Sequence, residues 1–276
     1  MSNVVAGLFA GQLAGGAVGA MLMEQLGFRA VFGVGVVVLL APLAGVLLLM
    51  RHYIEVPNAR APRLRRANAG LVETLRLLST RDFGLLLLGS VIPFSIAQVG
   101  LLSFALPLYL EAEGAAASSI GRVLMIYGLC VIYLGPLMGR LADRSRIKKR
   151  WIVAGGLIGS LGLLSLHFYS GLTAASLAVL ALALASCLAG ASHAPYLLAL
   201  PQVQQYGAGS AMSVMRAADK LGQMAGPLVV GMMFGTVGMG SGLAVTGIIY
   251  LAGTLVFLLF VRASAPPIAE PAPSGR

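Results

Sequence analysis

The stretch "GRLADRSRIKKR", residues 139–150, decides the fold class of this chain through its contrast with its surroundings. It gathers six basic residues around one acid, Asp143, and a long apolar run lies on either side of it. Apolar runs of about 20 residues cross the hydrocarbon layer of a membrane as helices. A basic stretch between two such runs is typical of a loop that connects two membrane-spanning helices.

The composition of the whole chain supports the same class. It is 58% hydrophobic and 10% charged, with a mean hydropathy of +0.92, whereas about 25% of the residues in soluble proteins are charged. The apolar runs are too long for barrel strands, so only helices satisfy the backbone in lipid. We therefore predict an all-α, polytopic helical membrane protein with eight transmembrane helices, near residues 4–23, 28–50, 83–110, 119–138, 151–170, 172–197, 211–235 and 242–261.

The basic residues predict the orientation. With eight spans, 17 of the 19 basic residues lie on one side, and Arg29 and Arg122 lie on the other. Cytoplasmic loops are enriched in Lys and Arg, so we expect both termini in the cytoplasm and the protein in the cell (inner or plasma) membrane. The net charge of +10 is then a topology signal rather than a sign of nucleic-acid binding.

Four regions follow from this reading. Residues 1–50 hold two helices, residues 51–82 a basic cytoplasmic loop, residues 83–262 six helices, and residues 263–276 a Pro/Ala-rich tail predicted to be disordered. Within the loop, "LVETLRLLSTRDF" (71–83) places leucines at helical spacing, which predicts a short amphipathic helix on the membrane surface. An ordinary connector is the alternative.

Two glycine-rich hexapeptides lie six spans apart, "GQLAGG" (11–16) and "GQMAGP" (222–227). Small residues at every fourth position allow membrane helices to approach closely. The helix-packing candidates are Gly11, Gly15, Gly19, Gly222, Gly226, Pro227 and Gly231. Packing alone is one interpretation. The repetition also indicates two related six-helix halves, the first represented here by its last two helices.

With these features together, the chain resembles the major facilitator superfamily of transporters, over what would be helices five to twelve of twelve. That family carries a loop of the form G-x-L-A-D-R-x-G-R-K-R between the second and third helices of each half. The loop here matches at Gly139, Leu141, Ala142, Asp143, Arg144, Lys148 and Lys149. Arg146 replaces the second glycine and Ile147 replaces a base, so the turn is expected to differ.

The resemblance implies a truncated major-facilitator fold and secondary active transport of a small organic solute by rocking of two bundles. "GQMAGPLVVG" (222–231) resembles the family's antiporter signature, which suggests efflux or antiport. That signature belongs to the fifth helix, however, where this chain has "GQLAGGAVG" (11–19) with Gly16 in place of proline. The missing helices would come from the same longer chain or from a partner.

The acid-and-base loop is the candidate gate. The resemblance places Asp143 near the start of the first span, close to Ser2 and Asn3, where a helix amino terminus attracts a carboxylate. The gating candidates are Gly139, Asp143, Arg144, Lys148 and Lys149. We expect Asp143 to latch the cytoplasmic side while the basic residues contact the anionic inner leaflet. The alternative is that Asp143 only caps its own loop.

Polar residues within the spans are the candidates for substrate binding or coupling. Gln98 lies between Pro93 and Pro107 in the long third span, which we expect to be kinked, and interrupted helices line many transporter sites. The full set is Gln98, Arg122, His193, Arg216, Asp219 and Lys220. His193 is either a proton-coupling group or a local hydrogen-bonding partner. The expected partners are a small-molecule substrate, a coupling proton or ion, and the lipid bilayer.

The remaining signals predict absences. Cys130 and Cys187 both lie inside apolar runs, so we interpret them as buried small hydrophobic residues without metal-ligand spacing. The sequence has no H-E-x-x-H, G-x-S-x-G or nucleotide-loop motif, and we predict no metal, no cofactor and no enzyme activity. The alternative to transport is a non-transporting membrane sensor or regulatory module, or the remnant of a transporter.

Overall fold

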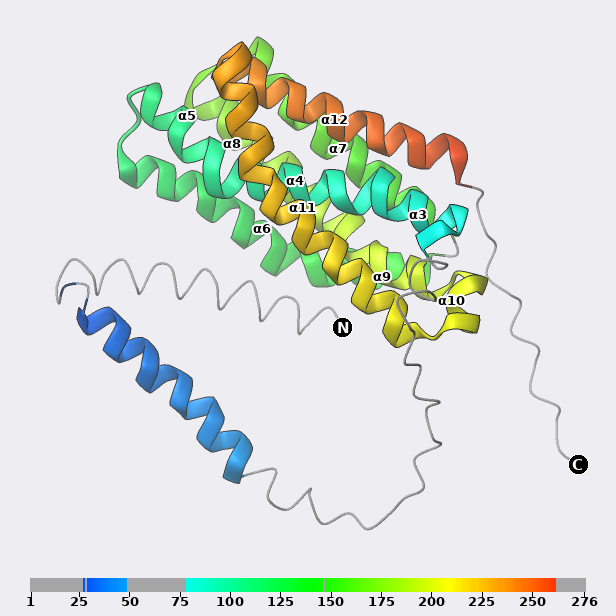
Figure 1. The fold of residues 1–276 in the computed structure, drawn as a ribbon. Coiled ribbons are helices and arrows are strands. Elements are labelled where there is room, and N and C mark those ends of the chain that lie inside the picture. Colours follow the sequence, from blue (N-terminus) through cyan, green and yellow to red (C-terminus); the bar gives the residue numbers. More distant parts are fainter. Residues whose placement is uncertain (1–26, 28, 49–77, 146, 262–276) are drawn as a thin grey trace, which may run out of the picture. The chain divides into compact units, whose positions relative to one another are not determined.

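The computed structural model describes residues 27, 29–48, 78–145 and 147–261, and the regular elements in them are all helices (Figure 1). The described residues fall into two compact units, with the helix Arg29–Leu48 in one and residues 78–261 in the other. The predicted span 4–23, most of the loop 51–82 with its amphipathic helix, and the tail 263–276 lie outside the described residues, as do Gly11, Gly15 and Gly19.

The described helices correspond to the other seven predicted spans, with ends that differ by a few residues. Six of them are long and apolar enough to cross a membrane: Arg29–Leu48, Arg81–Ala112, Ser119–Ala142, Lys148–Phe168, Gly171–Leu198 and Met239–Phe260. The seventh is the 30-residue helix α11, Ala208–Val237. It carries three charged residues within five positions, Arg216, Asp219 and Lys220.

The elements of the larger unit follow one another with short connections. The third predicted span consists of α3 (Arg81–Leu86), η2 (Leu87–Val91), α4 (Ile92–Val99), η3 (Gly100–Ala105) and α5 (Leu106–Ala112). After it come α6 (Ala117–Arg144), α7 (Lys148–Phe168), α8 (Gly171–Ala185), η4 (Ser186–Gly190), α9 (Ala191–Leu198), α10 (Pro201–Tyr206), α11 and α12 (Met239–Phe260). The η segments are single π-helical turns within longer helices.

Two of the π-helical turns explain how the third span accommodates its prolines. Pro93 follows η2 and Pro107 follows η3, each in the first turn of the next α-helical segment. Proline has no N–H to donate to the carbonyl four residues earlier, and its ring crowds that carbonyl. A π-helical turn re-routes the backbone hydrogen bonds at such a point. The disturbance that we expected at both prolines is therefore a local change of helix type.

Glycines allow the third span and α11 to touch backbone to backbone. A Cβ atom built on Gly226 would lie 2.9 Å from the backbone nitrogen of Gly100 and 2.9 Å from the carbonyl oxygen of Ile96. One turn earlier, a Cβ on Gly222 would lie 2.8 Å from the Cβ of Ser95. Lipid gives apolar helices no hydrophobic reason to associate, so this close van der Waals contact holds α4, η3 and α11 together.

The last helix, α12, is attached in the same way. A Cβ on Gly253 would lie 2.9 Å from the carbonyl oxygen of Gly89 in η2, and a Cβ on Gly89 would lie 3.0 Å from the carbonyl oxygen of Gly253. On α7, Gly159 faces the ring of Tyr250, where a Cβ would come within 2.8 Å of a ring carbon. Figure 1 shows α12 and α7 running side by side, which these contacts agree with.

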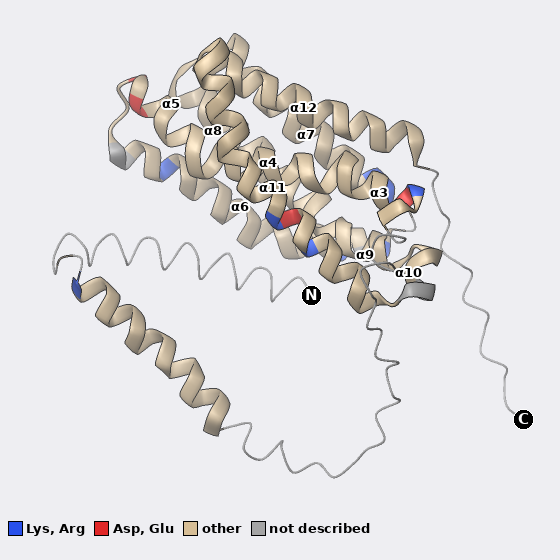
Figure 2. Cartoon of the chain, in the orientation of Figure 1, with Lys and Arg blue, Asp and Glu red and all other residues tan. Residues whose placement is uncertain are grey.

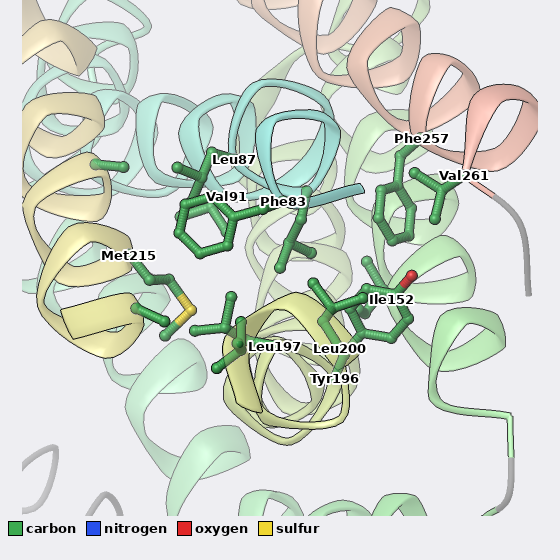
Figure 3. Packing of buried hydrophobic residues seen from close by; sticks show 14 of the residues in the cluster. Phe83, Leu87, Val91, Ile152, Tyr196, Leu197, Leu200, Met215, Phe257 and Val261 are labelled. Carbon is green, nitrogen blue, oxygen red and sulfur yellow. The ribbon is translucent and has the colours of Figure 1, made fainter. Parts of the chain in front are cut away.

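An aromatic and aliphatic cluster fills one end of the bundle (Figure 3). The ring of Tyr196 meets that of Phe257 edge to face at 5.7 Å between centroids, and Phe83, Leu197 and Phe257 are completely buried. Edge-to-face pairs of this kind contribute about 0.5–1.5 kcal/mol beyond their buried area. The cluster joins α3, α9, α11 and α12 at this end.

Particular residues determine where α12 begins and stabilise its last turn. Gly238, with a φ of 82°, follows α11 directly and precedes Met239, so a left-handed glycine makes the whole connection. At the other end, the ammonium of Lys149 donates to the carbonyl oxygen of Leu258 at 2.7 Å and also to that of Val261. A cation on the last carbonyls of a helix stabilises it by about 0.3–1 kcal/mol.

The close contact at Gly226 gives a prediction with a matched control in the same helix. Gly226→Ala should lower the free energy of unfolding by about 1–3 kcal/mol, because the new methyl group has to push two backbones apart. Gly235→Ala should raise it by about 0.5–1 kcal/mol, because nothing lies within 4 Å of that position and alanine favours the helix. Thermal unfolding of the detergent-purified chain measures both. Equal effects would show that α11 and η3 do not touch.

Candidate functional site

Charged side chains are rare in the helical unit, and one acidic position lies partway along α11 rather than at a helix end (Figure 2). This is Asp219. Besides the contact of Lys149 with α12, hydrogen bonds between side chains of different helices link α6, α11 and the two helices with π-helical turns in the described part of the chain. They form three short networks. Each of them contains a residue that the sequence analysis singled out.

The first network surrounds Asp219. Its Oδ1 accepts a hydrogen bond of 2.5 Å from the hydroxyl of Ser95, and its Oδ2 accepts one of 3.2 Å from the amide of Gln223. The ammonium of Lys220 donates to the amide oxygen of Gln223 at 2.8 Å, so the amide lies between the cation and the carboxylate. Both carboxylate oxygens therefore accept hydrogen bonds from neutral donors. Lys220 is linked to the carboxylate only through the side-chain amide of Gln223.

Asp219 is itself half-buried, but its hydrogen-bond partner lies in the interior of the bundle. Ser95, its partner, is fully buried and lies close to the middle of the 32-residue span Arg81–Ala112. The contact joins residues 124 positions apart in the chain. An ionisable group at membrane depth is costly unless it has a function and polar partners.

The second network holds His193 in the interior. Its Nε2 lies 2.8 Å from the hydroxyl of Ser90, and its ring meets that of Phe94 edge to face at 5.8 Å between centroids. Only 6% of the His193 surface is exposed. The histidine is thus a buried hydrogen-bonding residue.

The third network ties three helices together through Tyr127. The amide of Gln98 donates to the hydroxyl oxygen of Tyr127, and that hydroxyl lies 2.8 Å from the Oγ of Ser186. Ser186 gives its own proton to the carbonyl oxygen of Leu182 at 2.9 Å. Because the Ser186 proton is already used, Tyr127 donates to Ser186. The hydrogen bonds thus run in one direction, from Gln98 to Tyr127 to Ser186.

The π-helical turns and the polar networks coincide. Ser90 lies within η2, Ser186 opens η4, and Gln98 lies just before η3. His193 follows η4 by three residues. Single π-helical turns inside α-helices occur often at functional sites. Sequence reasoning selected Gln98, His193 and Asp219 but missed Ser90 and Ser186, because a serine in an apolar run resembles many other small residues.

The other cavity candidates are not part of these networks. Arg122, near the start of α6, and Arg216, in α11, have exposed side chains and make no hydrogen bond to the networks within the described part of the chain. An open depression of about 470 Å³ lies elsewhere, at the connection between α7 and α8, where Ser170 and Thr173 line it. It contains none of the candidate residues.

Most of the acid-and-base stretch, residues 139–150, is helical rather than a loop. α6 continues through Gly139 and Asp143 to Arg144, and α7 begins at Lys148. The side chain of Asp143 lies outside the described residues, as does Arg146, so the latch stays a prediction. Lys149 binds the last carbonyls of α12, which assigns it a fixed structural contact in this conformation. Gly231 lies 3.4 Å, measured from a built Cβ, from the ring of Phe104, and Pro227 lies inside α11.

Comparison with known proteins shows which family and which solved structures this chain is similar to. Residues 1–206 match the family described as the Major Facilitator Superfamily, and no curated protein matches the chain significantly. The fold is similar to the crystal structure of the peptide transporter POT in complex with sulfate, with a TM-score of 0.55 and 21% identity over 67% of this chain and 40% of that one. A mutant of that transporter in complex with alafosfalin gives a TM-score of 0.54 and 23% identity over 63% of this chain and 37% of that one.

The chain therefore spans about two-fifths of the length of the solved transporters that it matches. The likeness to them is one of fold. The family match covers 206 of the 276 residues, and six of the described helices are long and apolar enough to cross a membrane. The chain therefore belongs to the Major Facilitator Superfamily of membrane transporters.

Proposed function

We propose that this chain takes part in the secondary active transport of a small organic solute, and that the networks around Asp219, His193 and Gln98 bind the solute or a coupling proton. Alternating access by rocking of two helical bundles is the mechanism that the family implies. Efflux or antiport is the direction that the glycine and proline pattern of α11 suggests. The observation that carries the proposal is the hydrogen bond from Ser95 to Asp219 near the middle of an apolar span.

The chemistry of Asp219 supports a coupling role. As a carboxylate it only accepts hydrogen bonds, and both of its oxygens already do so. A proton taken up from the transport pathway would turn one oxygen into a donor, so the bond from Ser95 or from Gln223 would have to rearrange. Protonation would thus change the contact between α11 and α4, which is the kind of local event that a transporter needs in order to couple a proton to movement.

His193 supports the same proposal from a second helix. It is buried on α9, where its Nε2 lies 2.8 Å from the hydroxyl of Ser90. A histidine ring can donate or accept a proton, which makes it a candidate coupling group. His193 on α9 and Asp219 on α11 would then be two candidate proton-binding groups, while Gln98 and Tyr127 offer neutral hydrogen-bonding groups for a polar solute.

The carboxylate gives the most direct test of this function. Asp219→Asn should lower the rate of transport by about tenfold or more, since one charge-assisted hydrogen bond and the proton-binding group are both lost. Transport is measured by screening small organic solutes in cells that express the chain and in sealed vesicles. Glu113→Gln is the matched control, because Glu113 is an exposed carboxyl group at the end of α5.

Wild-type transport by Asp219→Asn, at unchanged expression and thermal stability, would contradict the coupling role. Loss of transport in both variants would point to a general effect of removing negative charge. A solute that moves at the same rate with and without a proton gradient, in the unmodified chain, would leave Asp219 as a binding residue and remove the proton from the proposal.

The latch at Asp143 belongs to the same proposal and has its own test. Asp143→Asn should lower the transport rate several-fold and increase labelling, by an impermeant maleimide added from the cytoplasmic side, of a cysteine placed at Met224, whose side chain is 76% exposed on α11. The reason is that an amide is held less strongly than a carboxylate at a helix amino terminus. Unchanged transport together with unchanged labelling would discard the latch.

A further inference from the structure

The two cysteines of the chain lie next to each other although they are 57 residues apart in sequence. Cys130 is on α6 and Cys187 is in η4, and both are free and buried, with 8% and 2% of their surfaces exposed. The thiol of Cys187 lies 3.9 Å from the backbone carbonyl oxygen of Cys130, so its side chain contacts the helix turn that carries Cys130. They face one another across a helix contact.

That contact is fixed by its neighbours on both sides. Tyr127 precedes Cys130 by three residues, so the two share a face of α6, and Ser186 precedes Cys187 directly. The 2.8 Å bond between Tyr127 and Ser186 thus holds α6 and η4 together about one turn from the thiols. On its other side η4 is pressed against α7, because a Cβ on Gly155 would lie 2.8 Å from the backbone nitrogen of Ala189.

We propose that Cys130 and Cys187 form a two-thiol site for a soft, thiophilic ligand that accepts two sulfurs, the class to which trivalent arsenicals belong. Sulfur ligands select soft centres, and because the Cys187 thiol already contacts the backbone of Cys130, the two thiols need little movement to bind a single atom between them. The site lies inside a lipid-embedded bundle, which an uncharged organic arsenical can enter from the membrane. It does not depend on the transport function proposed above.

The reaction with phenylarsine oxide balances without any oxidant. Two S–H bonds and the arsenic–oxygen group of the reagent break, and two arsenic–sulfur bonds form. The oxygen leaves with the two thiol protons as one molecule of water, and the oxidation states of arsenic and sulfur stay as they were. The adduct links α6 to η4 through one atom, beside the bond from Tyr127 to Ser186.

The experiment uses the full chain, purified in mild detergent, with phenylarsine oxide at equimolar concentration and intact-mass detection. We expect one arsenic per chain and loss of both thiols to N-ethylmaleimide. Cys130→Ser and Cys187→Ser should each weaken binding by about 100-fold, because the second sulfur no longer binds intramolecularly. Thermal unfolding of each variant verifies that it folds.

A displaced thiol is the matched control. Cys130→Ser combined with Leu129→Cys keeps two cysteines but turns one of them by about 100° around α6, toward a position that is 47% exposed. It should bind as weakly as the single variants. The proposal is overturned if the unmodified chain forms no arsenical adduct, whether or not N-ethylmaleimide reaches the thiols, or if the single or displaced variants bind as tightly as the unmodified chain.

Discussion

The structure depends on the backbone contact between α11 and the third span, where Gly222 and Gly226 meet Ser95, Ile96 and Gly100. In lipid, small residues are what allow two helices to approach this closely. Asp219 lies one turn before Gly222 on α11, so the same approach brings its carboxylate to the hydroxyl of Ser95. A polar group that would be costly in hydrocarbon is thereby given a partner, and the polar interior of the bundle is arranged around it.

The π-helical turns extend this arrangement to the other helices. A turn of π-helix shifts the side chains that follow it around the helix, so η2, η3 and η4 set which residues of the third span and of Gly171–Leu198 face the interior. Ser90 meets His193 and Ser186 meets Tyr127 under these shifted registers. Small residues and π-helical turns together thus give an apolar bundle a few hydrogen-bonded polar sites, which is the property that a membrane transporter needs.

Much of the fold could be predicted because lipid imposes strong rules on sequence. Long apolar runs predict the seven described spans to within a few residues, and the stretch around Asp143 indicates the family that residues 1–206 match. The site could be predicted only in part. Gln98, His193 and Asp219 are conspicuous in apolar runs, but their partners are serines and a tyrosine 29 to 124 residues away. Hydrophobic periodicity carries no information on such contacts, nor on the pairing of Cys130 with Cys187.

The central claim is that Asp219 is bound by Ser95 inside the bundle, and a double-mutant cycle tests it most directly. Ser95→Ala, Asp219→Asn and the double variant are compared with the unmodified chain by thermal unfolding in detergent. We expect the sum of the two single destabilisations to exceed that of the double variant by about 1–3 kcal/mol, because both single variants lose the same charge-assisted hydrogen bond. Strictly additive effects would show that the two residues do not interact, which would contradict the arrangement of α11 against the third span.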